Sequence, residues 1–364
     1  MFIGNPFKGA FGLDIGDLSI KLVRLTPRHD FHHRQYFLVD DIRQISLPPG
    51  YVVNGEIQQP EPLRKKIQRL LEKQSGRPAI KSPYVVVDLP EPKTFLKLID
   101  VPVPIDQIMI EDVIAHARHH LPFNLEETYL DWQAITSLSS ENNSKVLIGA
   151  APKIIADSYT YLLESVGLQP IGLEVEALSI ARALITDNKD YTGEARALLD
   201  LGATRSSLSV YDHGIIQFST NLKFSGELLT TALSQQLKME REEAEKIKIK
   251  HGLSYQTRSP RYLKIMLSLC DELVDEIKKA LQFYYEHFGN ANKITHITMC
   301  GGVSKLQKLS SLLARRLKIS AEPGQAWKNL FNSRLPEQLK EKGALYTSAI
   351  GLALRAAQNP LEKK

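Results

Sequence analysis

The sequence predicts an α/β fold of two related domains, with a smaller α+β unit inserted into the first. The main observation is a hairpin that occurs twice, at Gly12–Lys21 and at Leu199–Leu208. In each copy an apolar strand ends in Asp-apolar-Gly, a turn of small residues follows, and a second apolar strand leaves. A third apolar strand follows each hairpin, and a length of 364 residues suits two domains. Two such meanders indicate an internal duplication.

The segments between the two meanders belong to neither copy. Residues 61–73 carry apolar side chains at helical spacing and predict an amphipathic helix, and the apolar run Tyr84–Val87 predicts a short buried strand. From residue 92 to 167 the pattern predicts a compact α+β unit, with strand, helix, strand, strand and helix at residues 94–99, 106–120, 129–135, 145–151 and 153–166.

Helices dominate the chain after the second meander. They are predicted at residues 226–238, 241–251 and 259–288. A strand then ends in Gly301-Gly302, which leads into an amphipathic helix. The last helix, at residues 344–357, is rich in small residues, so it can pack close to a sheet or to another helix. The tail, residues 359–364, is predicted to be disordered.

Composition excludes several functions. A net charge of +5 is far from the clustered basicity of a nucleic-acid-binding protein. No apolar run is long enough for a membrane span, and no signal peptide is evident, so a cytoplasmic protein is expected. Cys270 and Cys300 lie far apart, as suits a reducing compartment. The basic run Arg64–Lys66, with Arg69 and Lys73, could touch anionic lipid, but we interpret it as a solvated helix face.

The turns of the two hairpins have the chemistry of phosphate-binding sites. Glycine lets the backbone approach an anion, successive N–H groups point inward, and hydroxyl side chains add donors. Asp14 and Asp200, at the strand ends, can hold Mg²⁺ through water. Asp-X-Gly alone is ordinary turn chemistry. The two turns become informative together with the Gly301-Gly302 turn.

Taken in order, two such hairpins, a Glu/Lys helix and a Gly-Gly turn resemble the actin-like ATP-binding superfamily over most of the chain. The Glu/Lys helix is Arg241–Gly252, in which Glu245 and Lys248 share one face. The resemblance implies two domains, built like duplicated ribonuclease-H-like domains, that close over ATP and Mg²⁺. The nucleotide-binding residues that it implies are Asp14, Gly16, Asp17, Ser19, Lys21, Asp200, Gly202, Ser206, Gly226, Glu227, Glu245, Lys248, Gly301, Gly302 and Ser304.

The inserted unit narrows the resemblance to the FtsA and PilM families, because actin and the heat-shock chaperones lack it at this position. Leu121–Glu127 followed by Leu130–Gln133 resembles the PilM pattern, in which a helix ends at Leu-Pro-Phe and a strand starts with Asp-aromatic-Gln. Glu174–Leu178 is similar to the PilM crossover into the second domain, and Lys223–Thr230 to the start of the nucleotide-facing helix. Asp17 departs from the family, which has a small residue there, and a metal could offset its charge.

The resemblance also implies domain boundaries. The first actin-like domain would comprise residues 1–91, completed by a crossover at 168–195, with the insert at 92–167 between them. The second domain would comprise residues 196–223 and 289–340, with a helical subdomain at 224–288. Residues 341–364 would return to the first domain as a helix and a tail.

A PilM-like chain is expected to be a cytoplasmic component of the type IV pilus assembly complex, peripheral at a bacterial inner membrane and in indirect contact with it. The resemblance implies that it binds the cytoplasmic N-terminal peptide of a PilN-type membrane protein, in a groove between the insert and the first domain. Glu176 is the candidate to orient an attacking water. Weak or no ATPase activity is expected, and enzyme activity and self-association are left open.

Two alternative functions are less consistent with the residues. An FtsA-like filament former usually ends in an amphipathic membrane-binding helix, and the tail after Arg355 has few apolar residues. A small-molecule kinase of the superfamily would need a phosphoacceptor motif, and we find none in the sequence.

Overall fold

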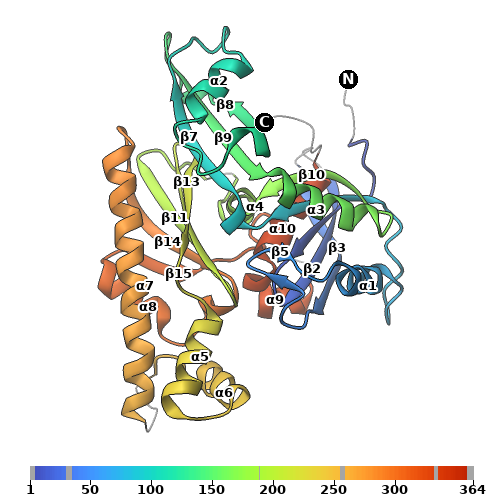
Figure 1. Ribbon diagram of the computed structural model, residues 1–364, viewed down its shortest axis with the longest axis vertical. Coiled ribbons are helices and arrows are strands. Elements are labelled where there is room, and N and C mark those ends of the chain that lie inside the picture. The colour runs from blue at the N-terminus through green and yellow to red at the C-terminus, as the bar shows by residue number, and fades with distance from the viewer. Residues whose placement is uncertain (1–4, 30–34, 188, 255–258, 332–334, 359–364) are drawn as a thin grey trace. The chain divides into compact units, whose positions relative to one another are not determined.

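The computed structural model describes residues 5–29, 35–187, 189–254, 259–331 and 335–358. The chain divides into two compact units (Figure 1). Unit 1 comprises residues 1–188, 216–219 and 326–364, and unit 2 comprises residues 189–215 and 220–325. The predicted disordered tail lies outside the described residues.

The main sheet of unit 1 contains the first predicted meander and two further strands. Its order is β10, β6, β1, β2 and β3, with bounds Gln169–Val175, Tyr84–Leu89, Phe11–Ile15, Ser19–His29 and Gln35–Ser46. β1, β2 and β3 are antiparallel neighbours, whereas β6 pairs in parallel with β1 and with β10. The carboxyl ends of β1, β6 and β10 therefore meet at one end of the sheet. A small hairpin, β4 (Val52–Val53) and β5 (Glu56–Ile57), follows β3.

α1 (Pro60–Leu71) and α3 (Lys153–Glu164) pack against one face of this sheet. α3 lies at the end of the predicted insert, and its apolar face joins the buried cluster beneath β1, β2 and β6. The buried hydroxyl of Tyr159 donates a hydrogen bond to the Gly55 carbonyl oxygen at 2.9 Å. The last helix of the predicted insert is thus part of the hydrophobic core under the main sheet.

α10 (Thr347–Ala357), preceded by α9 (Glu337–Lys342), packs against the other face of the sheet and against α4 (Glu176–Leu184). Both contacts require glycine. A Cβ atom on Gly12 of β1 would lie 2.4 Å from the Ala353 nitrogen, and a Cβ atom on Gly351 would lie 1.8 Å from the Ser179 carbonyl oxygen. The close packing predicted from the small residues of this helix is confirmed.

The remaining strands of unit 1 are antiparallel and have a core of their own. β7 (Phe95–Val101), β9 (Ser144–Pro152) and β8 (Thr128–Ala134) pair in that order, and residues 216–219 lie beside β7. α2 (Ile110–Ala117) packs on them and is shorter than the predicted 106–120. It begins later because the Asp112 carboxylate accepts the Met109 N–H at 3.0 Å and caps the helix there.

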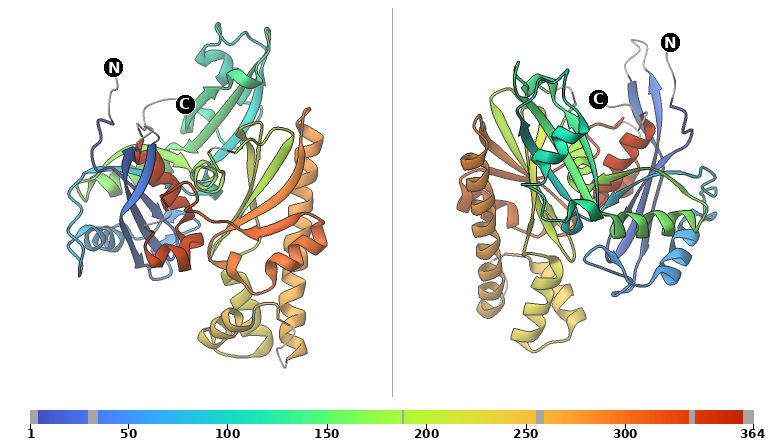
Figure 2. Two further views of the ribbon diagram at one scale, coloured as in Figure 1. Left: turned by 180° about the vertical axis from the view of Figure 1, so that it is seen from behind. Right: turned by 45° about the horizontal axis from the view of Figure 1, so that its top comes forward.

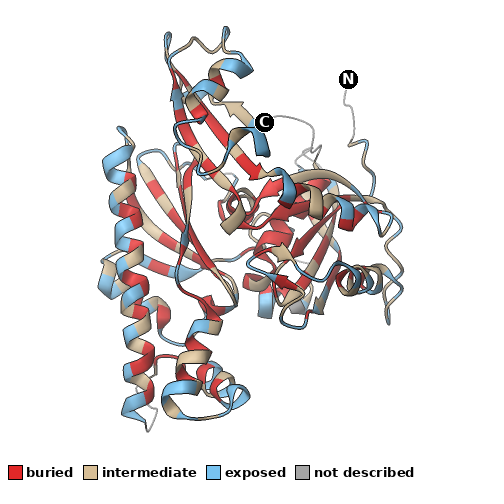
Figure 3. Ribbon diagram, viewed as in Figure 1, coloured by how far each residue is buried: buried red, intermediate tan, exposed pale blue. Residues whose placement is uncertain are grey.

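The sheet of unit 2 contains the second predicted hairpin. Its order is β15, β14, β11 and β12, with bounds Ser320–Pro323, Lys293–Cys300, Glu194–Leu201 and Ser206–Asp212, and β13 (Ile215–Leu222) completes the predicted meander. The predicted helices are present as α5 (Gly226–Leu237), α6 (Arg241–His251), α7 (Pro260–His287) and, after the Gly-Gly turn, α8 (Leu309–Leu317). α7 runs alongside the sheet (Figure 2), with one buried stripe (Figure 3).

Candidate nucleotide-binding site

Three buried carboxylates gather at the carboxyl ends of the parallel strands of unit 1. Asp14 lies in β1, Asp88 lies beside it near the end of β6, and Glu176 follows β10 as the first residue of α4. Each is less than a tenth exposed. The Lys21 ammonium pairs with the Asp14 carboxylate at 2.7 Å across the first hairpin. Asp88 was missed from the sequence, although an acidic residue directly after the apolar run Tyr84–Val87 is a signal for it.

The turn of the first hairpin is closed by the Gly16 N–H, which donates to the Ser19 carbonyl oxygen at 3.0 Å. The Asp17 carboxylate accepts the N–H groups of Asn54 and Gly55 at 3.0 and 3.1 Å, in the β4–β5 turn. The negative charge of Asp17 is therefore engaged by backbone donors of a neighbouring hairpin. These two hydrogen bonds satisfy the buried carboxylate of Asp17, the residue that departs from the family pattern.

Another buried carboxylate, that of Glu174 near the end of β10, is held by two arginines. The Glu174 side chain is 1% exposed, and the Arg182 guanidinium contacts both of its oxygens at 2.6 and 2.8 Å, while Arg355 donates at 2.9 Å. Burial alone would raise the pKa of Glu174, but the two guanidinium groups outweigh it and hold the pKa below its usual value. This ion cluster fixes the end of β10 from which Glu176 projects. The Ser348 hydroxyl also donates to Glu176 at 3.4 Å.

In unit 2 the Gly-Gly turn lies directly against Asp200. β11 and β14 are parallel, and Asp200 pairs in register with Cys300, whose thiol donates to the Asp200 carboxylate at 3.4 Å. Gly301 has a φ of +78°, and a Cβ atom on it would lie 2.5 Å from an Asp200 oxygen and 2.4 Å from the Leu201 carbonyl oxygen. Only glycine fits this position. The Ser304 hydroxyl donates back to the Gly301 carbonyl oxygen at 2.7 Å.

The start of α5 docks on the turn of the second hairpin. The Gly226 N–H donates to the Gly202 carbonyl oxygen at 3.1 Å, and the Glu227 N–H donates to the Ala203 carbonyl oxygen at 2.7 Å. Ser206, in the same hairpin, is 2% exposed, and among the described residues its hydroxyl has no hydrogen-bond partner. Buried hydroxyl groups are normally satisfied, so the Ser206 O–H is a spare hydrogen-bond donor in this hairpin.

Glu245 and Lys248 share a face of α6, as predicted, and pair at 2.6 Å. The Lys248 ammonium is buried, however, and also donates to the Gly226 carbonyl oxygen at 3.0 Å and to the Thr230 hydroxyl at 2.8 Å. It therefore holds α6 against the start of α5. An ion pair between Glu227 and Arg241 joins the same two helices.

Unit 2 thus brings together the predicted residues of the hairpin, the Gly-Gly turn, the start of α5 and the middle of α6, and unit 1 brings together those of the first hairpin. The family model of the type IV pilus assembly protein PilM matches residues 12–357. The chain belongs to the PilM family. Both the predicted family and the predicted actin-like fold are confirmed.

This PilM-family chain is similar to a structure of a PilM–PilN type IV pilus biogenesis complex, with 26% identity and a TM-score of 0.82 over 97% of this chain and 100% of that one. It also shares its fold with the ethanolamine utilization protein EutJ from Carboxydothermus hydrogenoformans (14% identity, TM-score 0.55, 94% and 88% covered). MreB5 of Spiroplasma citri bound to AMPPNP is a third match (10% identity, TM-score 0.54, 95% of both chains covered).

Two further properties of this PilM-family chain bear on function. None of the described helices is long and apolar enough to cross a membrane. Among the described residues, His, Cys, Asp and Glu side chains form no group of three or more that could hold a metal ion directly. A magnesium ion at Asp14 or Asp200 would therefore need water or phosphate oxygens for its other ligands.

Proposed function

We propose that this chain is a cytoplasmic, ATP-binding component of the type IV pilus assembly complex. It would be held at the inner membrane by capturing the cytoplasmic N-terminal peptide of a PilN-type membrane protein. The observation that carries the proposal is the similarity over 97% of the chain to a structure of a PilM–PilN complex. The PilM-family match across residues 12–357 supports it.

The residues of unit 2 fit a phosphate group and a hydrated magnesium ion. The unsatisfied Ser206 hydroxyl would donate to a phosphate oxygen. Asp200 would accept hydrogen bonds from magnesium-bound water. When bound, Mg²⁺ offsets the charge of the phosphates. In unit 1, Lys21 and the backbone of the Gly16 turn would bind phosphate in the same way, with Asp14 as the carboxylate.

Glu176 would orient a water molecule for hydrolysis. Its carboxylate is buried, so water reaches it only when the nucleotide site admits one. Glu176 is the one residue that we assign to this step, and we expect slow turnover, far below a median enzyme rate of about 10 s⁻¹.

The first prediction tests the nucleotide site. Gly302→Val should abolish binding of ATP with Mg²⁺, because a branched side chain on the exposed Gly302 would stand in the turn next to Gly301, which lies against Asp200, without entering a core. Isothermal titration calorimetry measures the binding of ATP directly. Gly289→Val is the matched control, because Gly289 also lies in a loop and has open space around it. Undiminished ATP binding by Gly302→Val would contradict the proposed role of the Gly-Gly turn.

The peptide surface that we propose follows β8, the outer strand of the insert, and the adjoining α3. It consists of Tyr129, Ile154 and Tyr161, which are 52%, 77% and 69% exposed. The Tyr129 hydroxyl donates to Asp157 of α3 at 3.1 Å, which joins the strand to the helix. Ile154 and Tyr161 are two turns apart and share one face of α3. Among the described residues β8 has no strand on its outer side, and an exposed apolar stripe beside such an edge suits an extended peptide.

The second prediction tests this surface. Ile154→Asp combined with Tyr161→Ala should weaken binding of a synthetic PilN-type N-terminal peptide by about tenfold or more, because exposed aromatic and aliphatic anchors carry most of such binding energy. Fluorescence anisotropy with the labelled peptide measures the dissociation constant.

Ile249→Asp is the control for Ile154→Asp, since Ile249 is similarly exposed, at 66%, and lies on α6 of unit 2. Equal affinities of the double variant and the wild type would place the peptide elsewhere. Failure of the wild type to bind the peptide or the full-length membrane protein, with and without ATP, would overturn the proposed function.

A further inference from the structure

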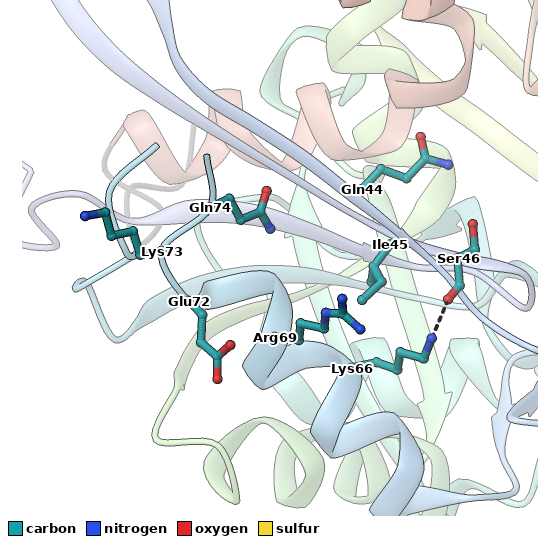
Figure 4. A pocket seen from close by; sticks show the side chains of 8 residues that line it. All are labelled: Gln44, Ile45, Ser46, Lys66, Arg69, Glu72, Lys73 and Gln74. Atoms are coloured by element: carbon teal, nitrogen blue, oxygen red, sulfur yellow. Dashed lines mark hydrogen bonds between the residues drawn. The ribbon is translucent and has the colours of Figure 1, made fainter. Parts of the chain in front are cut away.

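A cavity of about 560 Å³ opens in unit 1 between the outer strand of the main sheet and α1 (Figure 4). We call it the β3–α1 groove and define it by Gln44, Ile45 and Ser46 of β3 and by Lys66, Arg69 and Lys73. Gln44 and Ser46 are exposed residues of β3. Its β3 residues Ser46 and Gln44 pair in register with Ser19 and Lys21 of β2, which are candidate nucleotide residues.

The strand that borders the groove ends the main sheet. β3 pairs with β2 along one side and has no strand on the other side among the described residues. Another part of this outer edge already accepts a backbone bond, because the Phe331 N–H donates to the Phe37 carbonyl oxygen at 2.9 Å. The edge can therefore pair with an extended segment, as exposed sheet edges do.

The charges that line the groove are mostly positive. Lys66 and Arg69 point toward Ile45 and Ser46 (Figure 4), and the Lys66 ammonium donates to the Ser46 carbonyl oxygen at 3.2 Å. In the part of the chain that the structure describes, Lys66, Arg69 and Lys73 pair with no carboxylate. Arg64 on the same helix differs, because it pairs with Glu61 at 3.0 Å. Three basic side chains and one acidic one, Glu72, leave the groove positive.

We propose that the β3–α1 groove binds an acidic, extended segment of a partner protein. The segment adds as a strand to the edge of β3 at Gln44–Ser46, where its backbone N–H replaces the Lys66 ammonium on the Ser46 carbonyl oxygen, and its carboxylates pair with the released Lys66 and with Arg69 and Lys73. The half-buried Ile45 provides an apolar contact between the charges. A peptide fits better than a membrane surface because the site is recessed and offers backbone groups of a strand, which a flat layer of headgroups cannot use. The proposal is independent of the nucleotide and PilN proposals.

The test uses a fluorescein-labelled peptide of alternating Asp and Val residues and the full-length protein. Anisotropy should show binding that weakens with salt, and hydrogen exchange should show protection at Gln44–Ser46. Lys66→Glu combined with Arg69→Glu should weaken binding by about tenfold or more, because charge-assisted bonds are lost. Lys65→Glu is the matched control, since Lys65 is exposed on the same helix but does not line the groove, and it should change the affinity less than about twofold.

Two further measurements test whether the peptide pairs as a strand and whether the ligand is a peptide or an anionic membrane. A peptide of the same composition with N-methylated backbone amides should bind at least about tenfold more weakly if the segment pairs as a strand. Equal binding of the N-methylated peptide, or equal binding by the double variant, would overturn the proposal. Sedimentation with vesicles that contain anionic lipid provides the membrane comparison. If the protein bound vesicles but not the peptide, and the double variant lost vesicle binding, the ligand of the groove would be a lipid headgroup. That result would also overturn the proposal.

Discussion

We expect Glu174→Gln to lower the free energy of unfolding by about 3 kcal/mol, at the lower end of the cost of breaking a buried ion pair. The substitution removes the charge that compensates Arg182 and Arg355, and the Glu174 side chain is 1% exposed. The side chains of Arg182 and Arg355 are 26% and 30% exposed, which lets water offset part of the loss. Urea denaturation followed by circular dichroism measures the effect.

The pH dependence of this variant gives a second measurement. Because the pKa of Glu174 is held below its usual value of 4.5 in the folded protein, the carboxylate stabilises the fold above that pH. This contribution is lost as the pH falls below about 4.5 and through the folded-state pKa. Wild-type stability should therefore fall more steeply with acid than that of Glu174→Gln. The control is Glu164→Gln, at an exposed position of α3, which should change neither the free energy of unfolding nor its dependence on pH. Equal acid slopes in all three proteins would contradict the assigned ion cluster.

Gly351→Ala should destabilise unit 1 by more than about 3 kcal/mol, the upper end of ordinary overpacking. A Cβ atom at this position would lie 1.8 Å from the carbonyl oxygen and 2.5 Å from the carbonyl carbon of Ser179. Both atoms belong to the backbone of α4, so no side-chain rotation can relieve the clash, and α10 must move away from α4. Thermal unfolding followed by circular dichroism reports the loss.

The matched control is Gly172→Ala in β10 of the same unit. A Cβ atom there would meet a Val86 methyl group at 3.6 Å and the Arg355 guanidinium at 3.7 Å, which are ordinary contact distances. Its stability should stay within about 1 kcal/mol of the wild type. If Gly351→Ala were as stable as Gly172→Ala, the close approach of α10 and α4 would be wrong.

Much of the fold could be predicted from local pattern, because hairpin turns and amphipathic spacing are local properties. The two meanders, the long helix α7 and the close packing of α10 are of this kind. The destination of α3 could not be predicted in this way. Its apolar face has the same helical spacing whichever core receives it, and it joins the core under the main sheet.

In the candidate site, too, features of local pattern could be predicted and contacts between distant segments could not. The contact between Gly301 and Asp200 follows from two motifs that end parallel strands, and the sequence indicated both motifs. The role of Lys248 was not evident, because only the folded chain brings its ammonium to the Gly226 carbonyl oxygen of another helix. The partners of Asp17 lie at Asn54 and Gly55, and no local pattern links residues so far apart.

The way in which the chain leaves the insert has a mechanical consequence. β9 ends at Pro152 and α3 begins at Lys153, and α3 is separated from β10 by four residues, while α4 follows β10 without a gap. No slack linker interrupts this path, and α3 is anchored in the core. A force applied to the strands β7, β9 and β8 would therefore act on α3 and β10, and so on the start of α4 at Glu176, with no slack segment to take it up.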